Sequence, residues 1–231
     1  MTRVETHPFV LGVVMLDTRF PRLEGEIGNP ASFPFQTLYR RVAAATVARV
    51  VTDEALEPAL AEDILAACRA LADEGVSLIA TSCGFLGSLQ AQLEQELAVP
   101  VLSSALVLIP FLRTLHGPAA KIGVLTFDSR RLAPRHFAGW HDANIAVEGI
   151  ETGEELYPAI AEDRAEIDHG RAEAEAVAAA RRLMARHPDV AVILLECTNL
   201  SPYRQAIARA TGRPVADLVQ AICWRAGMEP S

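Results

Sequence analysis

Lysine is nearly absent from this sequence. Lys121 is the only lysine among the 21 basic residues, and it begins an apolar run that reads as a buried strand. An enzyme that uses pyridoxal phosphate needs a lysine in its site to form a Schiff base. The start of a strand is the wrong end for a site in a parallel α/β protein. The sequence therefore argues against pyridoxal phosphate chemistry.

Metal-ligand and redox spacings are also lacking. The six histidines show no paired spacing and no H-E-x-x-H motif, and the four cysteines show no C-x-x-C motif. Neither a zinc site nor a redox-active disulfide is predicted, and we expect no cofactor. The cysteines, which we expect to be reduced thiols, are Cys68, Cys83, Cys197 and Cys223.

The chain has no long apolar run and no excess of basic residues. No run reaches the roughly 18 residues of a membrane span, and the short run Phe9–Leu16 lacks a small-residue cleavage site, so it is predicted as a strand and not a signal peptide. The net charge of −8 argues against binding to nucleic acid or to anionic lipid. We expect a cytoplasmic protein, with a homodimer or a higher homo-oligomer left open.

Short apolar runs alternate with segments of helical periodicity, in a chain of 231 residues that is 51% apolar. This alternation predicts an α/β fold of parallel strands with helices on both faces of the sheet. The predicted strands are Phe9–Leu16, Val76–Thr81, Val99–Leu102, Lys121–Phe127, Ile145–Gly149, Val190–Leu195 and Pro214–Ala216. The predicted helices are Phe35–Val51, Pro58–Glu74, Phe85–Leu97, Ser104–Leu115, Arg130–Trp140, Glu166–Arg186, Tyr203–Thr211 and Asp217–Ala226.

The sequence contains an internal repeat. Gly12–Arg19 resembles Gly123–Arg130, and Val76–Cys83 resembles Val190–Cys197 at almost the same offset. We interpret the repeat as a duplication that gives two pseudo-symmetric lobes, residues 1–105 and 110–215, each a parallel sheet flanked by helices. Residues 217–231 either cap the second lobe or cross back to complete the first. The active site is expected in the cleft between the lobes.

Cys83 and Cys197 occupy equivalent positions, directly after a buried strand and before a helix. Ligands of parallel α/β proteins bind beyond the carboxyl ends of the strands, and a helix N-terminus there stabilises a thiolate. Two thiols on opposite walls of a cleft can remove a proton from one face of a carbon and deliver one to the other. Cys68 and Cys223 lie on apolar helix faces and are predicted to be buried.

The motifs Thr81-Ser-Cys-Gly-Phe85 and Glu196-Cys-Thr-Asn-Leu200, with Asp17-Thr18 after the first strand, resemble the aspartate/glutamate/hydantoin racemase superfamily over nearly the whole chain. The resemblance implies a cofactor-independent enzyme with Cys83 and Cys197 as its acid/base pair. Asp17 and Thr18 match the Asp-Ser pair of glutamate racemases. Thr198 matches the threonine after their second cysteine.

The sequence departs from glutamate racemases at both motifs. Those enzymes typically have Cys-Asn-Thr where this chain has Cys83-Gly84-Phe85, and Asn199 stands where they have a histidine. Asn199 can form hydrogen bonds but cannot exchange a proton at neutral pH, so we expect glutamate to be a poor substrate. The superfamily's decarboxylase pattern keeps only the second cysteine, whereas maleate isomerase keeps both and uses one as a nucleophile.

Several polar residues beside these motifs are candidates for binding substrate. Gly84 would permit close approach of an anion to the backbone, and the resemblance suggests that the Thr126 hydroxyl binds a carboxylate. Asp17 could instead cap a turn. The Gly- and Pro-containing loop Arg22–Phe35 could bend over the cleft as a lid or could be an ordinary surface loop. The complete set of substrate-binding candidates is Asp17, Thr18, Ser82, Gly84, Thr126, Thr198 and Asn199.

These observations favour a cofactor-independent racemase or epimerase that inverts the carbon next to a carboxylate in an amino acid or related acid. An enzyme similar to maleate isomerase or arylmalonate decarboxylase, acting on a dicarboxylate, is the alternative. A non-catalytic two-lobe binding protein is a third hypothesis, although a binding protein has no need of two thiols on opposing walls.

Overall fold

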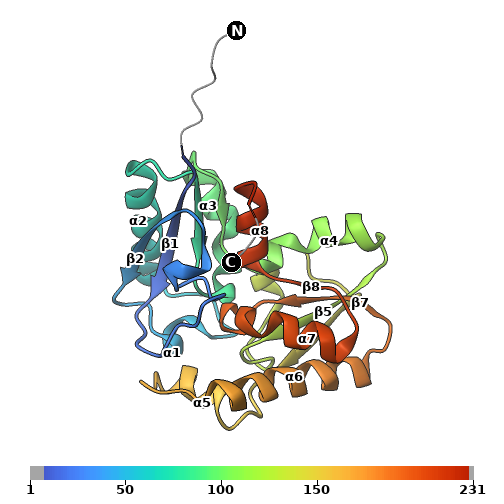
Figure 1. The fold of residues 1–231 in the computed structure, drawn as a ribbon. Coiled ribbons are helices and arrows are strands. Elements are labelled where there is room, and N and C mark those ends of the chain that lie inside the picture. The colour runs from blue at the N-terminus through green and yellow to red at the C-terminus, as the bar shows by residue number, and fades with distance from the viewer. Residues whose placement is uncertain (1–7, 229–231) are drawn as a thin grey trace.

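The computed structural model describes residues 8–228 and contains two four-stranded sheets (Figure 1). The strand orders are β2-β1-β3-β4 and β6-β5-β7-β8, and all neighbouring strands are parallel. Helices flank both sheets, so the predicted α/β class with two similar parallel sheets is confirmed. The two orders are equivalent, since in each sheet the first strand along the chain lies between the second and the third.

The strands are β1 (Val10–Leu16), β2 (Gln36–Val42), β3 (Leu78–Thr81), β4 (Val101–Leu102), β5 (Lys121–Thr126), β6 (Ile145–Gly149), β7 (Val190–Leu195) and β8 (Val215–Ala216). The α-helices are α1 (Val47–Val50), α2 (Pro58–Asp73), α3 (Gln90–Glu96), α4 (Ile109–His116), α5 (Leu156–Ala161), α6 (His169–Arg186), α7 (Arg204–Thr211) and α8 (Leu218–Arg225). The 3₁₀-helices are η1 (Pro30–Ser32), η2 (Gly84–Leu89), η3 (Ala105–Leu108), η4 (Pro134–Phe137) and η5 (Thr198–Tyr203).

The central strands are buried on both faces, which explains why they read as continuous apolar runs. Helix α6 lies close to the second sheet because the side chains it buries are mostly alanine. Gly123 in β5 permits this approach, since a Cβ there would lie 2.6 Å from Leu183 of α6. Small residues on both surfaces therefore set the spacing of helix and sheet.

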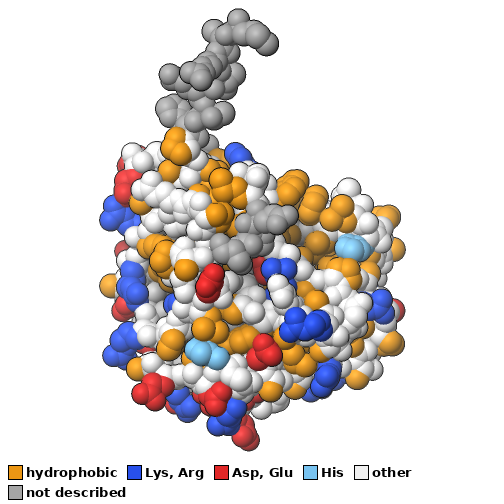
Figure 2. All heavy atoms as spheres, in the orientation of Figure 1, with side chains coloured by type: hydrophobic (Ala, Val, Ile, Leu, Met, Phe, Trp, Pro, Cys, Tyr) orange, Lys and Arg blue, Asp and Glu red, His pale blue; other side chains and the backbone are white. Residues whose placement is uncertain are grey.

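Helix α8 returns to the first half of the chain. The Arg225 guanidinium lies 6.0 Å from the centre of the Phe9 ring, at the start of β1. The buried side chains of α8 share an apolar cluster with strands of both sheets. Acidic and basic side chains are interspersed over the face shown in Figure 2. Within residues 8–228, none of the helices is both long enough and apolar enough to cross a membrane.

Two of the predicted helices are wrong. The segment Phe35–Val51 forms the edge strand β2 and only one helical turn, α1. Three of the seven β2 side chains are exposed and three are half-exposed, so period-two alternation is weak, and pairing with β1 along its whole length decides its conformation. The segment Arg130–Trp140 forms only η4, which begins at Pro134 and ends at Phe137, before Ala138, a residue with φ of 51°. Proline removes a helical donor, and a left-handed residue ends the turn.

Candidate active site

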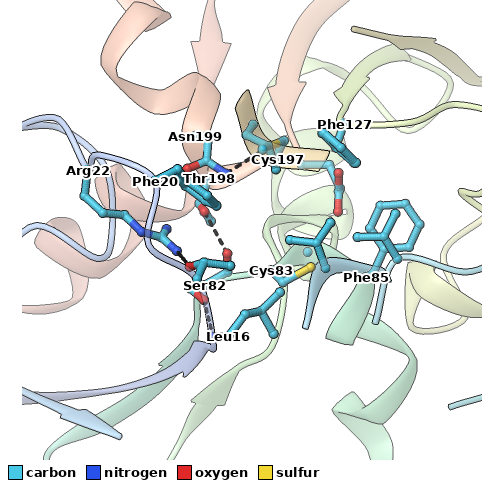
Figure 3. A pocket seen from close by; sticks show the side chains of 16 residues that line it. Leu16, Phe20, Arg22, Ser82, Cys83, Phe85, Phe127, Cys197, Thr198 and Asn199 are labelled. Atoms are coloured by element: carbon cyan, nitrogen blue, oxygen red, sulfur yellow. Dashed lines mark hydrogen bonds between the residues drawn. The ribbon is translucent and has the colours of Figure 1, made fainter. Parts of the chain in front are cut away.

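The carboxyl ends of β3 and β7 open onto one pocket (Figure 3). In Figure 3, Cys83 and Phe85 lie on one side of the pocket, and Cys197 and Phe127 lie on the other. The residues that line the pocket are Leu16, Thr18, Phe20, Arg22, Val47, Val51, Ser82, Cys83, Gly84, Phe85, Phe127, Ile160, Glu196, Cys197, Thr198 and Asn199. Its walls are thus mostly apolar, with a few polar groups.

Each cysteine is the extended residue between a strand and a six-residue 3₁₀-helix. Cys83 precedes η2 and Cys197 precedes η5, and both backbones are in the β region. The turn that follows aims a backbone N–H at each sulfur, from Phe85 toward Cys83 and from Asn199 toward Cys197. The Asn199 side-chain amide also lies 3.8 Å from the Cys197 sulfur. Cys197 therefore has the larger number of N–H partners.

Both thiols hold their protons strongly. Burial, followed by the negative charge of Glu196, raises the pKa of Cys83 and raises that of Cys197 to about 12. The N–H groups of the 3₁₀ turns oppose these shifts without cancelling them. A charge on Cys197 would also raise the pKa of Cys83, as expected for thiols that face one pocket. Formation of a thiolate here consequently depends on whether the neighbouring Glu196 carries its negative charge.

Five of the predicted substrate-binding residues line this pocket together with the two cysteines. Three of them are already engaged in internal hydrogen bonds. The Ser82 hydroxyl accepts a bond from the Leu16 N–H at 3.1 Å, and the Thr198 hydroxyl lies 2.9 Å from the Ser82 carbonyl oxygen. The Thr18 hydroxyl accepts a bond of 2.7 Å from Arg22. The five residues are Thr18, Ser82, Gly84, Thr198 and Asn199.

Asp17 and Thr126, the other two predicted residues, lie outside the pocket lining. Leu16 faces the pocket, and because successive strand side chains alternate in direction, Asp17 turns away. Its carboxylate is 45% exposed and lies 3.5 Å from Arg41. Thr126 is fully buried, and its hydroxyl donates a bond of 2.6 Å to Glu196 Oε2. Thr126 thus holds a pocket residue in place.

The loop Arg22–Phe35 carries two residues that belong to the site but were not among the predicted site residues. Among residues 8–228, Arg22 is the only basic residue that lines the pocket, and its guanidinium is 2.6 Å from the buried carboxylate of Glu26. Glu26 also accepts bonds from the Gly28 N–H and from the Thr198 hydroxyl. The four-residue spacing of Arg22 and Glu26 in a loop already considered functional could have identified the pair.

Glu196 is a third pocket residue that was not predicted from the sequence to have a role, although it stands in one of the motifs. It is 1% exposed, and within residues 8–228 its Oε1 atom has no hydrogen-bond partner. Burial raises its pKa to about 7, although the Thr126 hydroxyl and the Phe127 N–H act in the opposite direction. Gly84 makes room for it, since a Cβ there would overlap the carboxyl and lie 2.6 Å from the Glu196 carbonyl oxygen. The group that approaches Gly84 closely is therefore this carboxyl.

The chemistry available to the pocket is proton transfer at a small carbon acid. Two thiols and one carboxyl can exchange protons, and Arg22 supplies one positive charge. No group of three or more His, Cys, Asp or Glu side chains within residues 8–228 is arranged to hold a metal ion.

Comparison with known proteins identifies relatives of this chain. The model of the family described as Asp/Glu/Hydantoin racemase matches residues 45–226. A dimethylsulfoniopropionate lyase of Durusdinium sp. clade D is 31% identical over 217 residues, covering 90% of this chain and 71% of the lyase. Dimethylsulfoniopropionate lyase 5 of Emiliania huxleyi (strain CCMP1516) is 29% identical over 219 residues, covering 90% of this chain and 43% of the lyase. The chain thus spans less than half of the second relative.

Solved structures share the fold at lower sequence identity. The crystal structure of arylmalonate decarboxylase superposes with a TM-score of 0.59 at 15% identity, covering 94% of this chain and 91% of that one. A likeness at this identity establishes the arrangement of the two sheets.

Proposed function

This chain belongs to the Asp/Glu/Hydantoin racemase family, and from that premise we propose that it is a lyase. Its reaction would be the elimination of a sulfonium leaving group from the β-carbon of a small carboxylate, and dimethylsulfoniopropionate is the substrate to test first. The observation that carries the proposal is one small pocket with two thiols, a single arginine and aromatic walls. The lyase relatives support the same chemistry.

Arg22 is the group suited to bind the substrate carboxylate. A guanidinium matches a carboxylate in shape and charge. The Phe20 ring lies 4.4 Å below this guanidinium, and Thr18 and Glu26 fix its orientation. A substrate carboxylate at this position would lie in the same pocket as the two cysteines.

Phe85 and Phe127 are suited to hold the sulfonium end. Aromatic faces attract cations without strongly solvating them. Both rings are themselves supported, Phe85 by His136 at 4.8 Å between ring centres and Phe127 by Tyr157 at 4.6 Å. An apolar and aromatic wall also accommodates the methyl groups of a dialkyl sulfonium.

In the proposed reaction the Cys197 thiolate removes a proton from the α-carbon. The C–H electrons form the double bond, the β-carbon to sulfur bond breaks, and the sulfide leaves with that electron pair as a neutral molecule. The products are dimethyl sulfide, acrylate and a protonated Cys197. We assign the base to Cys197 because it has N–H partners from both the backbone and the side chain of Asn199.

A racemase or epimerase remains the second candidate, and one observation favours it. The leaving sulfide needs no proton, yet Cys83 lines the same pocket as Cys197. Two thiols are what inversion of a carbon centre requires. The exposed position of Asp17 leaves no role for it in binding an α-ammonium group, so an acid without an amino group is the better racemisation substrate to test.

The test is incubation of the purified chain with dimethylsulfoniopropionate. We expect dimethyl sulfide in the headspace and acrylate in solution in equal amounts. Cys197→Ser should lower kcat by about 100-fold or more, because a hydroxyl is a far weaker acid than a thiol. Cys223→Ala, which changes a buried thiol away from the pocket, is the control.

Other outcomes would replace the proposal. Absence of sulfide, together with deuterium uptake at the α-carbon of a chiral acid in D₂O and loss of its optical activity, would establish the racemase. Cys83→Ser and Cys197→Ser should then each stop interconversion. A thioether adduct between a cysteine and an unsaturated dicarboxylate would instead indicate an isomerase in which a cysteine acts as a nucleophile.

A further inference from the structure

Glu196 has no part in the elimination step, yet it is built into the pocket from several directions. It follows β7 and precedes Cys197, and its carboxyl is bonded to Thr126 of β5 and packed against Gly84 of η2. It therefore lies next to both cysteine turns. One of its oxygens is buried with no partner in the described chain, which is unusual for a carboxyl group in a folded protein.

The protonation state of this carboxyl affects how readily the pocket thiols can ionise. A thiol that loses its proton to bulk water would add a negative charge beside the Glu196 carboxylate. The negative charge of Glu196 opposes this, and it therefore raises the pKa of both thiols. If the proton moves to Glu196 instead, the carboxylate becomes neutral as the thiolate forms. The total charge of the pocket is then unchanged, and the repulsion that opposes the thiolate disappears.

We propose that Glu196 is the proton-exchange partner of the two pocket thiols. Its carboxylate accepts the proton of a cysteine, which converts the thiol to a thiolate and the carboxylate to a carboxylic acid. The S–H bond breaks with its electron pair left on sulfur, and a new O–H bond forms on the carboxyl. The carboxylic acid later returns the proton to water. Glu196 acts through the cysteines, so it is a positioning residue for their protons.

The inference rests on the proposed function only where turnover is concerned. In the elimination, Cys197 ends the cycle protonated, and Glu196 would regenerate its thiolate. In a racemase the same exchange would serve both cysteines. The control of thiol ionisation by Glu196 is independent of either substrate.

The first test is the pH profile of alkylation by iodoacetamide, with each cysteine followed by peptide mass spectrometry. In the wild-type protein, the rate of alkylation of Cys83 and Cys197 should rise with pH. The profile should show a break near pH 7, above which the rate rises less steeply because Glu196 ionises. In Glu196→Gln the break should vanish, so that alkylation is about 3- to 10-fold faster at pH 8 and little changed at pH 5.5. The charged and titratable groups near these sulfurs are Arg22, Glu26, Glu196 and the other cysteine.

Asp217→Asn is the matched control for this profile. Asp217 is also a buried carboxyl whose pKa burial raises, to about 6, but it does not line the pocket. Its replacement should leave the alkylation profile of both pocket cysteines unchanged. Identical profiles for wild type and Glu196→Gln would overturn the proposal.

The second test is turnover. Glu196→Gln should lower kcat by about 10-fold or more with little change in KM, even though its thiols react faster with iodoacetamide. A residue that merely fills space would not change the two rates in opposite directions. A kcat within twofold of wild type would overturn the proposal. If the wild type releases no sulfide, the alkylation profile still decides the role of Glu196, so the two proposals fail separately.

Thr126→Val provides a variant that keeps the carboxyl. In the wild type, the Thr126 hydroxyl lowers the pKa of Glu196. Removing this hydroxyl should therefore raise that pKa and move the break in the alkylation profile to higher pH. An unmoved break would show that the break does not arise from Glu196. This variant also keeps the inference testable if Glu196→Gln fails to fold.

Discussion

The Thr198 hydroxyl donates a hydrogen bond of 3.0 Å to Glu26, a residue 172 positions earlier in the chain. This contact joins the turn after Cys197 to the loop that carries Arg22. The first-half loop and the second-half cysteine are thereby held on the same pocket.

Thr198→Val should destabilise the fold. The variant keeps the shape of the side chain and removes a donor to the buried Glu26 carboxylate, which costs about 1–3 kcal/mol. Urea unfolding would measure the loss as a lower midpoint. Thr211→Val removes a hydroxyl that donates to the Ile207 carbonyl and accepts a long bond of 3.4 Å from the Arg213 N–H at the end of α7, and should change the midpoint much less. Equal losses in both variants would argue against a special role for the Glu26 contact.

Arg22→Met should affect both substrate affinity and stability. KM should rise about 10-fold or more because the only basic side chain lining the pocket is lost. The folded state should lose about 3–5 kcal/mol because the Glu26 carboxylate is left buried without its cation. Adding Glu26→Gln should restore much of the stability without restoring KM. Recovery of KM in the double variant would contradict a direct role of Arg22 in binding.

Gly84→Ala should lower activity and stability together. The added Cβ would overlap the Glu196 carboxyl and crowd its carbonyl oxygen, which typically costs about 1–3 kcal/mol and here displaces a pocket residue. Gly170→Ala is the control, because Gly170 lies in the first turn of α6 and its nearest neighbour would be 3.4 Å away. There we expect unchanged activity and a slight gain in stability.

Asp217 should give the stability a specific dependence on pH. Burial, opposed by the Gln220 N–H and Arg204, raises its pKa from an ordinary 3.8 to about 6. The folded state therefore holds this proton more tightly than the unfolded state. The stabilisation is complete below about pH 3.8 and is lost as the pH rises through about 6.

Asp217→Asn would remove this dependence, since an asparagine can still cap α8. Relative to wild type, the variant should gain about 1–3 kcal/mol between pH 4 and pH 7.5 in unfolding experiments. His136, whose pKa burial lowers to about 4, gives the opposite slope. That contribution is the same in both proteins and cancels in the difference. A constant difference across this range would contradict the shifted pKa of Asp217.

The buried strands and the positions of the two cysteines were readable from the sequence. A strand buried on both faces must be apolar at every position, as β1 and β7 are. Such a strand can therefore be recognised from its own sequence, without knowing which strands lie beside it. The edge strand β2 was misread because half-exposed residues can satisfy either periodicity, and only its pairing with β1 selects the extended form.

The sequence by itself determined the fold class and the equivalent positions of a pair of cysteines, because both depend on local patterns: apolar runs, and a cysteine after each of two equivalent strands. Only the tertiary structure decided which polar groups share the pocket with that pair. The Thr198 hydroxyl joins the Arg22–Glu26 pair to the second half of the chain, Glu196 is bonded to Thr126 of β5, and Asp17 is exposed directly after β1. The raised pKa of Glu196 has the same origin, since burial exists only once the ends of two sheets have closed around the carboxyl.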